Sequence, residues 1–577
     1  MGCLMDSRSF DTQATFFATL VEEWVRGGIV DAVVAPGHRS TILAATLIKD
    51  GRLRVHVMVD ERSAAFFALG LGAATGKPAL FWCTSGTAAA EAHAAVIEAD
   101  LGKIPLLVCT ADRPPELHHS RDWQSIDQSR LYGASLRWQF DPGVADDAMA
   151  GAWRSIAARS VTETMFHPQG PGPVHLNLPI REPWKLEAGP GPAGREHGKP
   201  WHSVDLGAMQ PGGSALDALV SGSGKRGVIV VGRAEVDPDA VHACAQRLGW
   251  PVIAEARSGC RTATETTIGA AHDLLSVAGF AASHVPEIVL RIGTPVLSKA
   301  VAGWLHDSQA EEWLLDRHGV WEGPALDVDH IIVADPTLVC LALAERVEPS
   351  APSDWLAGWR HAESTAQEAI GTFLEAQPEP TEPAIARAVI TNLDAGNILF
   401  AGTSMPVRCV EWYAAPREGI RILANRGASG MDGVISTAAG VAAATSKPTV
   451  LLIGDLTALY DLNALWALRG VACAVNLTVV VIDNDGGGIF NNFPQLSSLG
   501  VEVFERVVAT PQGVNIVAVA QALDVESRSV ASVPELVAAI KQTTAVDGLS
   551  LIRIPTDRRR APLVLDELKV AVATALT

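Results

Sequence analysis

The sequence predicts an α/β protein with three doubly wound parallel-sheet domains. Short apolar runs alternate with segments of helical period, which is typical of parallel strands joined by crossover helices. Two stretches rich in glycine, proline and charged residues interrupt this alternation, and 577 residues are enough for about three to four domains. We therefore place domains at residues 1–187, 188–352 and 353–577.

The first unit begins with helical periodicity over residues 12–28, which ends at a glycine pair. The segment GLGAATG at residues 70–76 has the glycine spacing of a dinucleotide-binding fingerprint. Its glycines lie inside a helical pattern, whereas the fingerprint needs them at a strand-to-helix turn, so we reject that interpretation. A further helix is expected over residues 87–102, and apolar strands are expected within residues 29–37, 55–61, 78–86 and 104–112.

Two linkers, at residues 187–227 and 346–383, separate the second unit from its neighbours. The second unit has a helix at residues 239–249, and its strands are expected within residues 227–232, 251–259, 287–293 and 330–337. The strands of the third unit are expected within residues 397–404, 420–427, 448–455 and 477–485.

Charge and cysteine content narrow the class of protein. The 45 basic and 64 acidic residues give a net charge of −19, which disfavours nucleic acid and anionic membranes as partners. The eight cysteines are scattered without a CxxC pair, so we expect reduced thiols in the cores. No apolar run has the length of a membrane span or the form of an export signal, so we expect a cytoplasmic protein.

Polar residues follow two apolar strands of the third unit. One strand runs into Gly454-Asp455, and the other into Asp483-Asn484-Asp485 and three glycines. Parallel strands present their carboxyl ends at one edge of a sheet, where such folds bind ligands. Asp455 and Asn484 supply oxygen ligands for a hard cation, and the glycine-rich turn exposes backbone groups to phosphate. A metal-bridged diphosphate is therefore expected at this edge.

The segments GDLTALYDLNAL (454–465) and NDGGGIF (484–490) resemble the metal-diphosphate motif of thiamine-diphosphate enzymes. More narrowly, they resemble the 2-succinyl-5-enolpyruvyl-6-hydroxy-3-cyclohexene-1-carboxylate synthase family of the menaquinone pathway. The resemblance covers nearly the whole chain and implies pyrimidine-binding, central and diphosphate-binding domains, in that order. It implies magnesium, or manganese in its place, on Asp455, Asn484 and the Gly486 carbonyl. The family has asparagine where Asp483 and Asp485 stand here.

Glu61, just past an apolar strand in VMVDERSAA, matches the glutamate of the family's DER motif. A carboxylate against the aminopyrimidine of the cofactor favours the tautomer that activates the thiazolium carbon. The resemblance therefore implies that Glu61 activates thiamine diphosphate. The alternative is an ordinary carboxylate favoured by the dipole at a helix N-terminus.

Five cations placed near strand ends are candidates to hold anionic substrates. Taken singly, any of them could be a solvated surface charge, but five such cations stand out in a protein of net −19. The resemblance implies that they bind substrate carboxylates, and it adds Gln124 at the family's catalytic glutamine, although Asp122-Trp123 replaces the usual Ala-Asn before it. The five cations are Arg39, Arg113, Lys299, Arg408 and Arg426.

Other positions are implied to contact the cofactor. Met431 would support its bent shape, with core packing as the alternative, and Ile489 and Phe490 would form an apolar wall beside its reactive carbon. Two positions depart from the family, because His38 replaces a serine and Ala300 replaces an arginine. We expect His38 to supply part of the missing positive charge; the alternative is that it only donates a neutral hydrogen bond, as serine would. The remaining implied cofactor contacts are Gly402, Ser404, Ser429, Leu456 and Thr457.

The resemblance implies a carboligase that decarboxylates 2-oxoglutarate and adds the succinyl carbanion equivalent to isochorismate. It also implies a homodimer or a dimer of dimers. One alternative is another thiamine-diphosphate enzyme, either a simple 2-oxo-acid decarboxylase or an acetolactate-synthase-like carboligase. A second is a paralogue that binds the cofactor without catalysis, which the presence of Glu61, Asp455 and Asn484 argues against.

Overall fold

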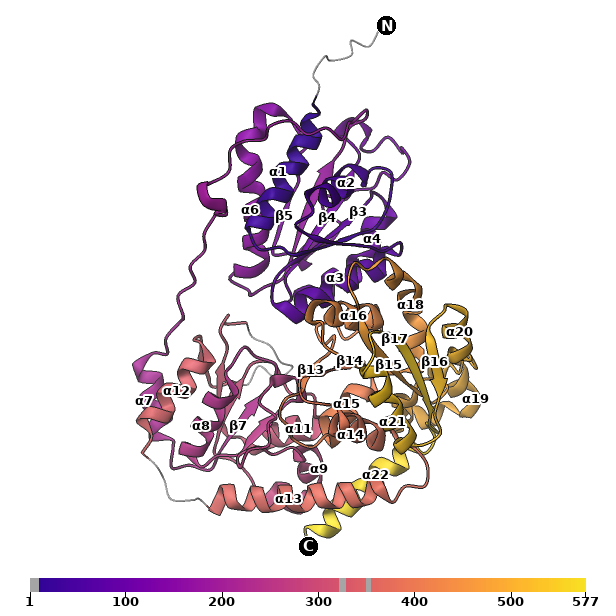
Figure 1. Ribbon diagram of the computed structural model, residues 1–577. Helices are drawn as coiled ribbons and strands as arrows, with labels where there is room; N and C mark the ends of the chain where they lie inside the picture. The colour runs from indigo at the N-terminus through magenta and orange to yellow at the C-terminus, as the bar shows by residue number, and fades with distance from the viewer. Residues whose placement is uncertain (1–9, 321–327, 349–353) are drawn as a thin grey trace.

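The computed structural model describes residues 10–320, 328–348 and 354–577. It contains three α/β units, each built on one parallel sheet, as Figure 1 shows from the indigo N-terminal unit to the yellow C-terminus. The strand orders are β2-β1-β3-β4-β6-β5, β11-β10-β9-β7-β8 and β13-β12-β14-β15-β17-β16. The predicted fold class is confirmed.

The first unit has helices on both sides of a six-stranded sheet. Its last two strands and the helix between them were not predicted, and the helix expected over residues 87–102 is two shorter helices that meet at Ala92. The elements are β1 (Asp31–Val34), β2 (Arg54–Val57), β3 (Ala79–Cys83), β4 (Leu106–Asp112), β5 (Trp138–Phe140), β6 (Pro173–Pro179), α1 (Thr12–Arg26), α2 (Thr41–Asp50), α3 (Glu61–Thr75), α4 (Thr87–Glu91), α5 (His93–Leu101) and α6 (Ala150–Phe166).

The second unit follows a long connection that runs down one side of the molecule in Figure 1. The end of the predicted linker over residues 187–227 forms a helix, and the strand Glu311–Leu315 was missed. The elements are β7 (Gly227–Val231), β8 (Val252–Ala254), β9 (Ile288–Ile292), β10 (Glu311–Leu315), β11 (His330–Ile332), α7 (Gly213–Ser221), α8 (Pro238–Leu248), α9 (Ala271–Ser276), α10 (Ala278–Ser283), α11 (Lys299–Ser308) and α12 (Pro336–Arg346).

The third unit carries the second half of the candidate site. Its strands are β12 (Ile398–Ala401), β13 (Arg421–Leu423), β14 (Thr449–Gly454), β15 (Asn476–Asp483), β16 (Glu526–Ser529) and β17 (Gly548–Pro555). Its helices are α13 (Asp354–Glu375), α14 (Glu382–Asn392), α15 (Met405–Tyr413), α16 (Val434–Thr445), α17 (Asp455–Tyr460), α18 (Asn463–Ala467), α19 (Val501–Phe504), α20 (Ile516–Ala522), α21 (Val533–Thr544) and α22 (Ala561–Ala575).

The prediction of a linker over residues 346–383 is wrong, because α13 occupies most of it. Trp359, Ala362, Ala366 and Ile370 recur at intervals of three and four residues and are buried. This spacing places them on one helical face. That face packs into a core shared by the second and third units, so the segment is part of the domain packing.

The first and third units meet where α3 crosses α16. A Cβ on Gly70 would lie 2.1 Å from the carbonyl oxygen of Thr437, and one on Gly440 would lie 2.2 Å from that of Phe67. Only glycine permits so close an approach of two backbones. Gly70 therefore serves helix packing, and Gly76 ends α3 in the left-handed conformation, which agrees with the rejection of a dinucleotide site.

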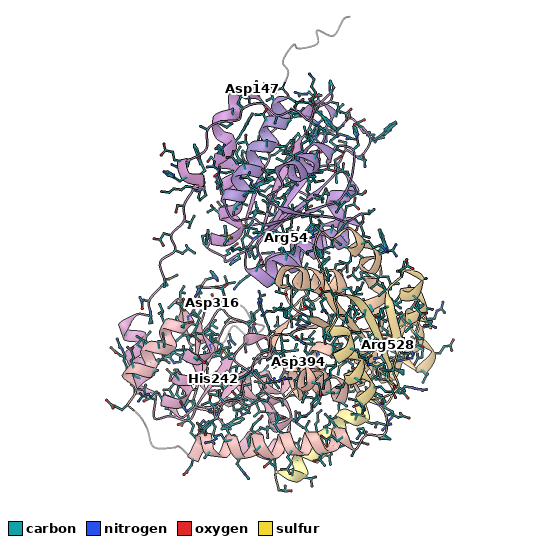
Figure 2. The ribbon with its side chains drawn as sticks, in the orientation of Figure 1. Arg54, Asp147, His242, Asp316, Asp394 and Arg528 are labelled. Carbon is teal, nitrogen blue, oxygen red and sulfur yellow. The ribbon has the colours of Figure 1, made fainter. Side chains whose placement is uncertain are left out.

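A second contact between these units lies at β2. Arg54, on the side of the first unit turned toward the third in Figure 2, pairs with Asp31 at 2.8 Å. Asp31 also lies 3.0 Å from His56, whose other ring nitrogen accepts from the backbone of Ala472 at 3.1 Å.

Within the described residues, no helix combines the length and the apolar character needed to cross a membrane.

Candidate functional site

The polar ends of β14 and β15 lie side by side at one edge of the third sheet. Gly454 pairs in register with Ile482, so Asp455 and the residues after β15 leave the sheet together. The Asp455 carboxylate accepts from the backbone of Leu456 at 2.8 Å and of Gly486 at 2.7 Å. Burial raises the pKa of Asp455 to about 7, and the nearby carboxylates of Asp483 and Asp485 add to the rise. A cation bound here would favour the charged form.

Asn484 presents an uncommitted oxygen at this edge. Its Nδ2 donates to Glu382 at 2.8 Å, while its Oδ1 is buried without a hydrogen-bond partner among the described residues. A buried acceptor without a donor is costly, and a cation would satisfy it. The described residues hold no cluster of three His, Cys, Asp or Glu suited to a metal, so a metal here would need amide and carbonyl oxygens beside Asp455. The residues present fit such a set of hard ligands.

Gly486 shapes the turn between these ligands. Its φ is +140°, and a Cβ at this position would lie 2.4 Å from the carbonyl oxygen of Ala509. Both features exclude other residues. The two acidic departures from the family have their own partners, because Asp483 pairs with Arg553 at 2.5 Å and Asp485 accepts backbone N–H groups of the 512–513 turn.

The loop with Arg426, Ser429 and Met431 is attached to the first unit. The buried carboxylate of Glu98 on α5 accepts from the backbone of Gly427 and Ala428 at 2.7 Å, and from that of Ser429 at 3.1 Å. Burial raises the pKa of Glu98, and these three N–H groups oppose the rise. Met431 is 42% exposed, which the alternative of core packing does not explain.

Two predicted cations of the third unit lack a counter-charge. Arg408 donates to the carbonyl of Ser404 at 2.7 Å, and neither Arg408 nor Arg426 has an ion-pair partner among the described residues. Burial lowers the pKa of both. For Arg426, repulsion by Arg257 and Arg408 adds to the lowering of the pKa, and the carboxylates of Glu255 and Glu98 oppose it more weakly. Such a site favours an anionic ligand.

Lys299 begins α11 and points toward the third unit. Its Nζ lies 5.7 Å from the centre of the Phe493 ring, within the range of a cation–π contact. Phe490 is 38% exposed and Ile489 is half-buried, so both remain available as an apolar wall.

Thr457 is buried in α17, one turn from Gly454, while a Cβ on Gly402 would lie 2.9 Å from the carbonyl of Leu452.

Glu61 is the first residue of α3, directly after the cap residue Asp60. Burial raises the pKa of the half-buried Glu61, and the carboxylates of Asp60 and Glu91 raise it further. Among the described residues Glu61 has no ion-pair partner. A half-buried carboxylate with a raised pKa and no cation nearby is suited to exchange a proton.

The predicted cations of the first unit are paired with carboxylates that the sequence did not reveal. Arg39 pairs with Glu182 at 2.9 Å, and His38 lies 3.5 Å from the same oxygen. Arg113 pairs with Asp122 at 3.1 Å and donates to the backbone of Trp123, so the Asp-Trp departure contributes directly to this arrangement. Gln124 follows in the exposed loop with a φ of +55°.

The structure brings the predicted residues together in two separate groups. Among the described residues, no hydrogen bond, ion pair or ring contact joins Glu61 to Asp455 or Asn484. The start of α3 instead contacts the far end of α17, because Arg62 donates to the carbonyl of Tyr460 at 2.9 Å. Asp455 begins that helix. The two halves of the predicted site therefore make no direct contact with each other among the described residues.

Comparisons with known proteins identify the class. Models of thiamine pyrophosphate enzymes match three successive segments: the N-terminal TPP binding domain over residues 14–131, the middle domain over 195–401 and the C-terminal TPP binding domain over 405–554. The fold is shared with benzoylformate decarboxylase from Polynucleobacter necessarius, with a TM-score of 0.70 at 15% identity, over 94% of this chain and 99% of that one. The fold and the three matched domains are those of a thiamine-diphosphate enzyme.

Similarity over the whole length narrows this class to one family. The chain is 39% identical to 2-succinyl-5-enolpyruvyl-6-hydroxy-3-cyclohexene-1-carboxylate synthase of Thermobifida fusca, over 96% of this chain and 98% of that protein. It is 37% identical to the synthase of the same name from Chloroflexus aurantiacus, over 94% and 93% of the two chains. The chain belongs to this synthase family, as its motifs predicted.

Proposed function

We propose that the protein uses thiamine diphosphate to decarboxylate 2-oxoglutarate and to add the resulting four-carbon unit to isochorismate. The product is 2-succinyl-5-enolpyruvyl-6-hydroxy-3-cyclohexene-1-carboxylate, an intermediate of menaquinone biosynthesis. The observation that carries this proposal is the near-complete coverage of the named synthases at 39% and 37% identity. A cytoplasmic location stays a prediction from the sequence.

Asp455, Asn484 and the Gly486 carbonyl would hold magnesium against the diphosphate. The unpartnered Oδ1 of Asn484 supports this assignment. Thiamine diphosphate, when bound, supplies the carbon centre that accepts the negative charge left by decarboxylation. Glu61 would hold or release a proton at the aminopyrimidine, and the rise of its pKa above the ordinary range of a glutamate favours that exchange.

The cations would bind and orient the carboxylates of the two substrates. Arg408 and Arg426 lack an anionic partner, so a substrate carboxylate would supply the charge that burial leaves unmatched. Arg39 and Arg113 already pair with Glu182 and Asp122, so a substrate would compete with these carboxylates for them. Lys299, Gln124, Ile489 and Phe490 would complete the substrate pocket.

A second copy of the chain would unite the two halves of this site. Glu61 makes no direct contact with Asp455 among the described residues, and a homodimer would place the first unit of one protomer against the third unit of its partner. A homodimer or a dimer of dimers is therefore proposed. Sedimentation analysis of the pure protein tests it, and a purely monomeric active enzyme would contradict it.

Product analysis tests the proposed reaction. We expect carbon dioxide release from 2-oxoglutarate that depends on thiamine diphosphate and magnesium, and an adduct of the expected mass when isochorismate is added. Turnover of pyruvate to acetolactate, or release of carbon dioxide with no adduct, would favour the alternative carboligase or decarboxylase. Absence of any turnover would favour the non-catalytic paralogue.

A further inference from the structure

Glu382 is a buried carboxylate that contacts the proposed metal site. It is the first residue of α14, is 4% exposed, and accepts from Nδ2 of Asn484 at 2.8 Å. Its second oxygen, Oε2, is buried without a hydrogen-bond partner, and no cation pairs with Glu382 among the described residues. A favourable helix dipole explains an acidic residue at this position, but not one that is buried against an amide.

The chemistry of the contact decides which way the Asn484 amide faces. An asparagine side chain has a donor on one side and an acceptor on the other, and the Oε1 atom of Glu382 accepts from the donor side at 2.8 Å. Glu382 therefore selects the orientation in which Nδ2 faces it. The reverse orientation would set two oxygens against each other and would turn an N–H group toward the cation.

The rest of Asn484 is already fixed. Arg558 donates to the backbone carbonyl of Asn484 at 3.2 Å and to that of Asp485 at 2.7 Å. On the other side, a Cβ on Gly488 would lie only 2.4 Å from Nδ2 of Asn484. The backbone is held and the side chain is closely packed, so the remaining freedom is the exchange of amide oxygen and nitrogen.

We propose that Glu382 is a positioning residue that turns the amide oxygen of Asn484 toward the divalent metal. This inference rests on the proposed function of Asn484 as a metal ligand. It assigns a role to a residue that does not itself reach the metal. Residues that orient metal ligands in this way commonly change metal affinity by about 10- to 100-fold when they are replaced.

An exchange of the two partners tests the proposal. Asn484→Asp sets a carboxylate against Glu382, and we expect magnesium affinity in the presence of thiamine diphosphate to fall by about 10-fold or more. Glu382→Gln in the same background restores a donor and an acceptor, and we expect most of that affinity to return. Glu382→Leu alone should also weaken binding by about 10-fold, since nothing then selects the amide orientation.

Titration calorimetry with magnesium and thiamine diphosphate measures the magnesium affinity of each variant without any turnover, and circular dichroism verifies the fold. Glu411→Gln is the matched control, because Glu411 is also buried in the third unit but hydrogen-bonds to Ala256 at 2.7 Å. That variant should bind metal normally. Equal affinities for Asn484→Asp with and without Glu382→Gln would overturn the proposal. Failure of the unmodified protein to bind magnesium would instead overturn the proposed metal site.

Discussion

Replacement of Asp273 by asparagine should change how stability depends on pH. Asp273 on α9 is fully buried, and neither carboxylate oxygen has a hydrogen-bond partner among the described residues. Burial raises its pKa from 3.8 to about 7, with Lys569 opposing the rise. A carboxyl whose pKa is higher in the folded state stabilises the protein at low pH and loses that contribution as pH rises through the folded value.

The structure sets the size of this effect. A gap of about three pKa units, at 1.36 kcal/mol each, corresponds to about 4 kcal/mol, of which about 3 kcal/mol falls between pH 5 and pH 8. Asparagine does not titrate, so the unfolding free energy of Asp273→Asn should rise by that amount relative to the unmodified protein over this range. Urea denaturation at pH 5, 6, 7 and 8 measures the difference.

Asp461 provides the matched control for this experiment. It is also fully buried with a pKa raised to about 7, chiefly by burial, but it accepts from the backbone and the hydroxyl of Ser436 at 2.8 and 3.2 Å. Asp461→Asn should remove a similar pH dependence and also lose about 1–3 kcal/mol at every pH, because one acceptor becomes a donor. Parallel pH curves for Asp273→Asn and the unmodified protein would refute the reasoning.

Three further predictions concern the site. Glu61→Gln should lower turnover by about 100-fold or more while calorimetry finds cofactor affinity within about tenfold of normal; near-normal turnover would remove Glu61 from the mechanism. Asp455→Ala should abolish magnesium-dependent binding of thiamine diphosphate, and unchanged binding would place the metal elsewhere. If His38, which lies 3.5 Å from Glu182, supplies a positive charge, KM for one substrate should rise with pH. His38→Ser should flatten that rise, and Ala300→Arg in the same background should restore affinity at high pH. Parallel KM curves for the unmodified protein and His38→Ser from pH 6 to 9 would limit His38 to a neutral hydrogen bond.

The sequence was most informative where function depends on neighbouring strands. The rule that parallel strands end at one edge of a sheet was enough to predict that Asp455 lies beside the turn after β15, and the pairing of Gly454 with Ile482 produces that adjacency. Reasoning from composition failed for α13, because the prolines on either side of this helix and the alanines and charges within it suggested a linker. The buried stripe that starts at Trp359 was present in the sequence as a spacing of three and four residues, and reading periodicity before composition would have found it.

The partners of the site residues could not be predicted in this way. Glu382 is 102 positions from Asn484, and Glu182 is 143 positions from Arg39. Neither carboxylate belongs to a motif, and each reaches its partner only because separate elements meet in the folded chain. A sequence pattern identifies groups that share one turn or one sheet edge, whereas the residues that orient them come from whichever element packs against that edge.

The geometry of the loop with Arg426 and Met431 depends on all three units. Glu98 of the first unit accepts three of the loop's N–H groups, and Arg233 of the second unit donates to the carbonyl of Gly102, at the end of the same helix. A Cβ on Gly427 would lie 2.6 Å from the backbone nitrogen of Gly102, so the loop and that helix end are in direct contact. The third unit alone has the residues of this loop but not the carboxylate that sets its backbone. The packing of the three units against one another is therefore part of the site, since contacts with the first two units fix the backbone from which Arg426 and Met431 extend.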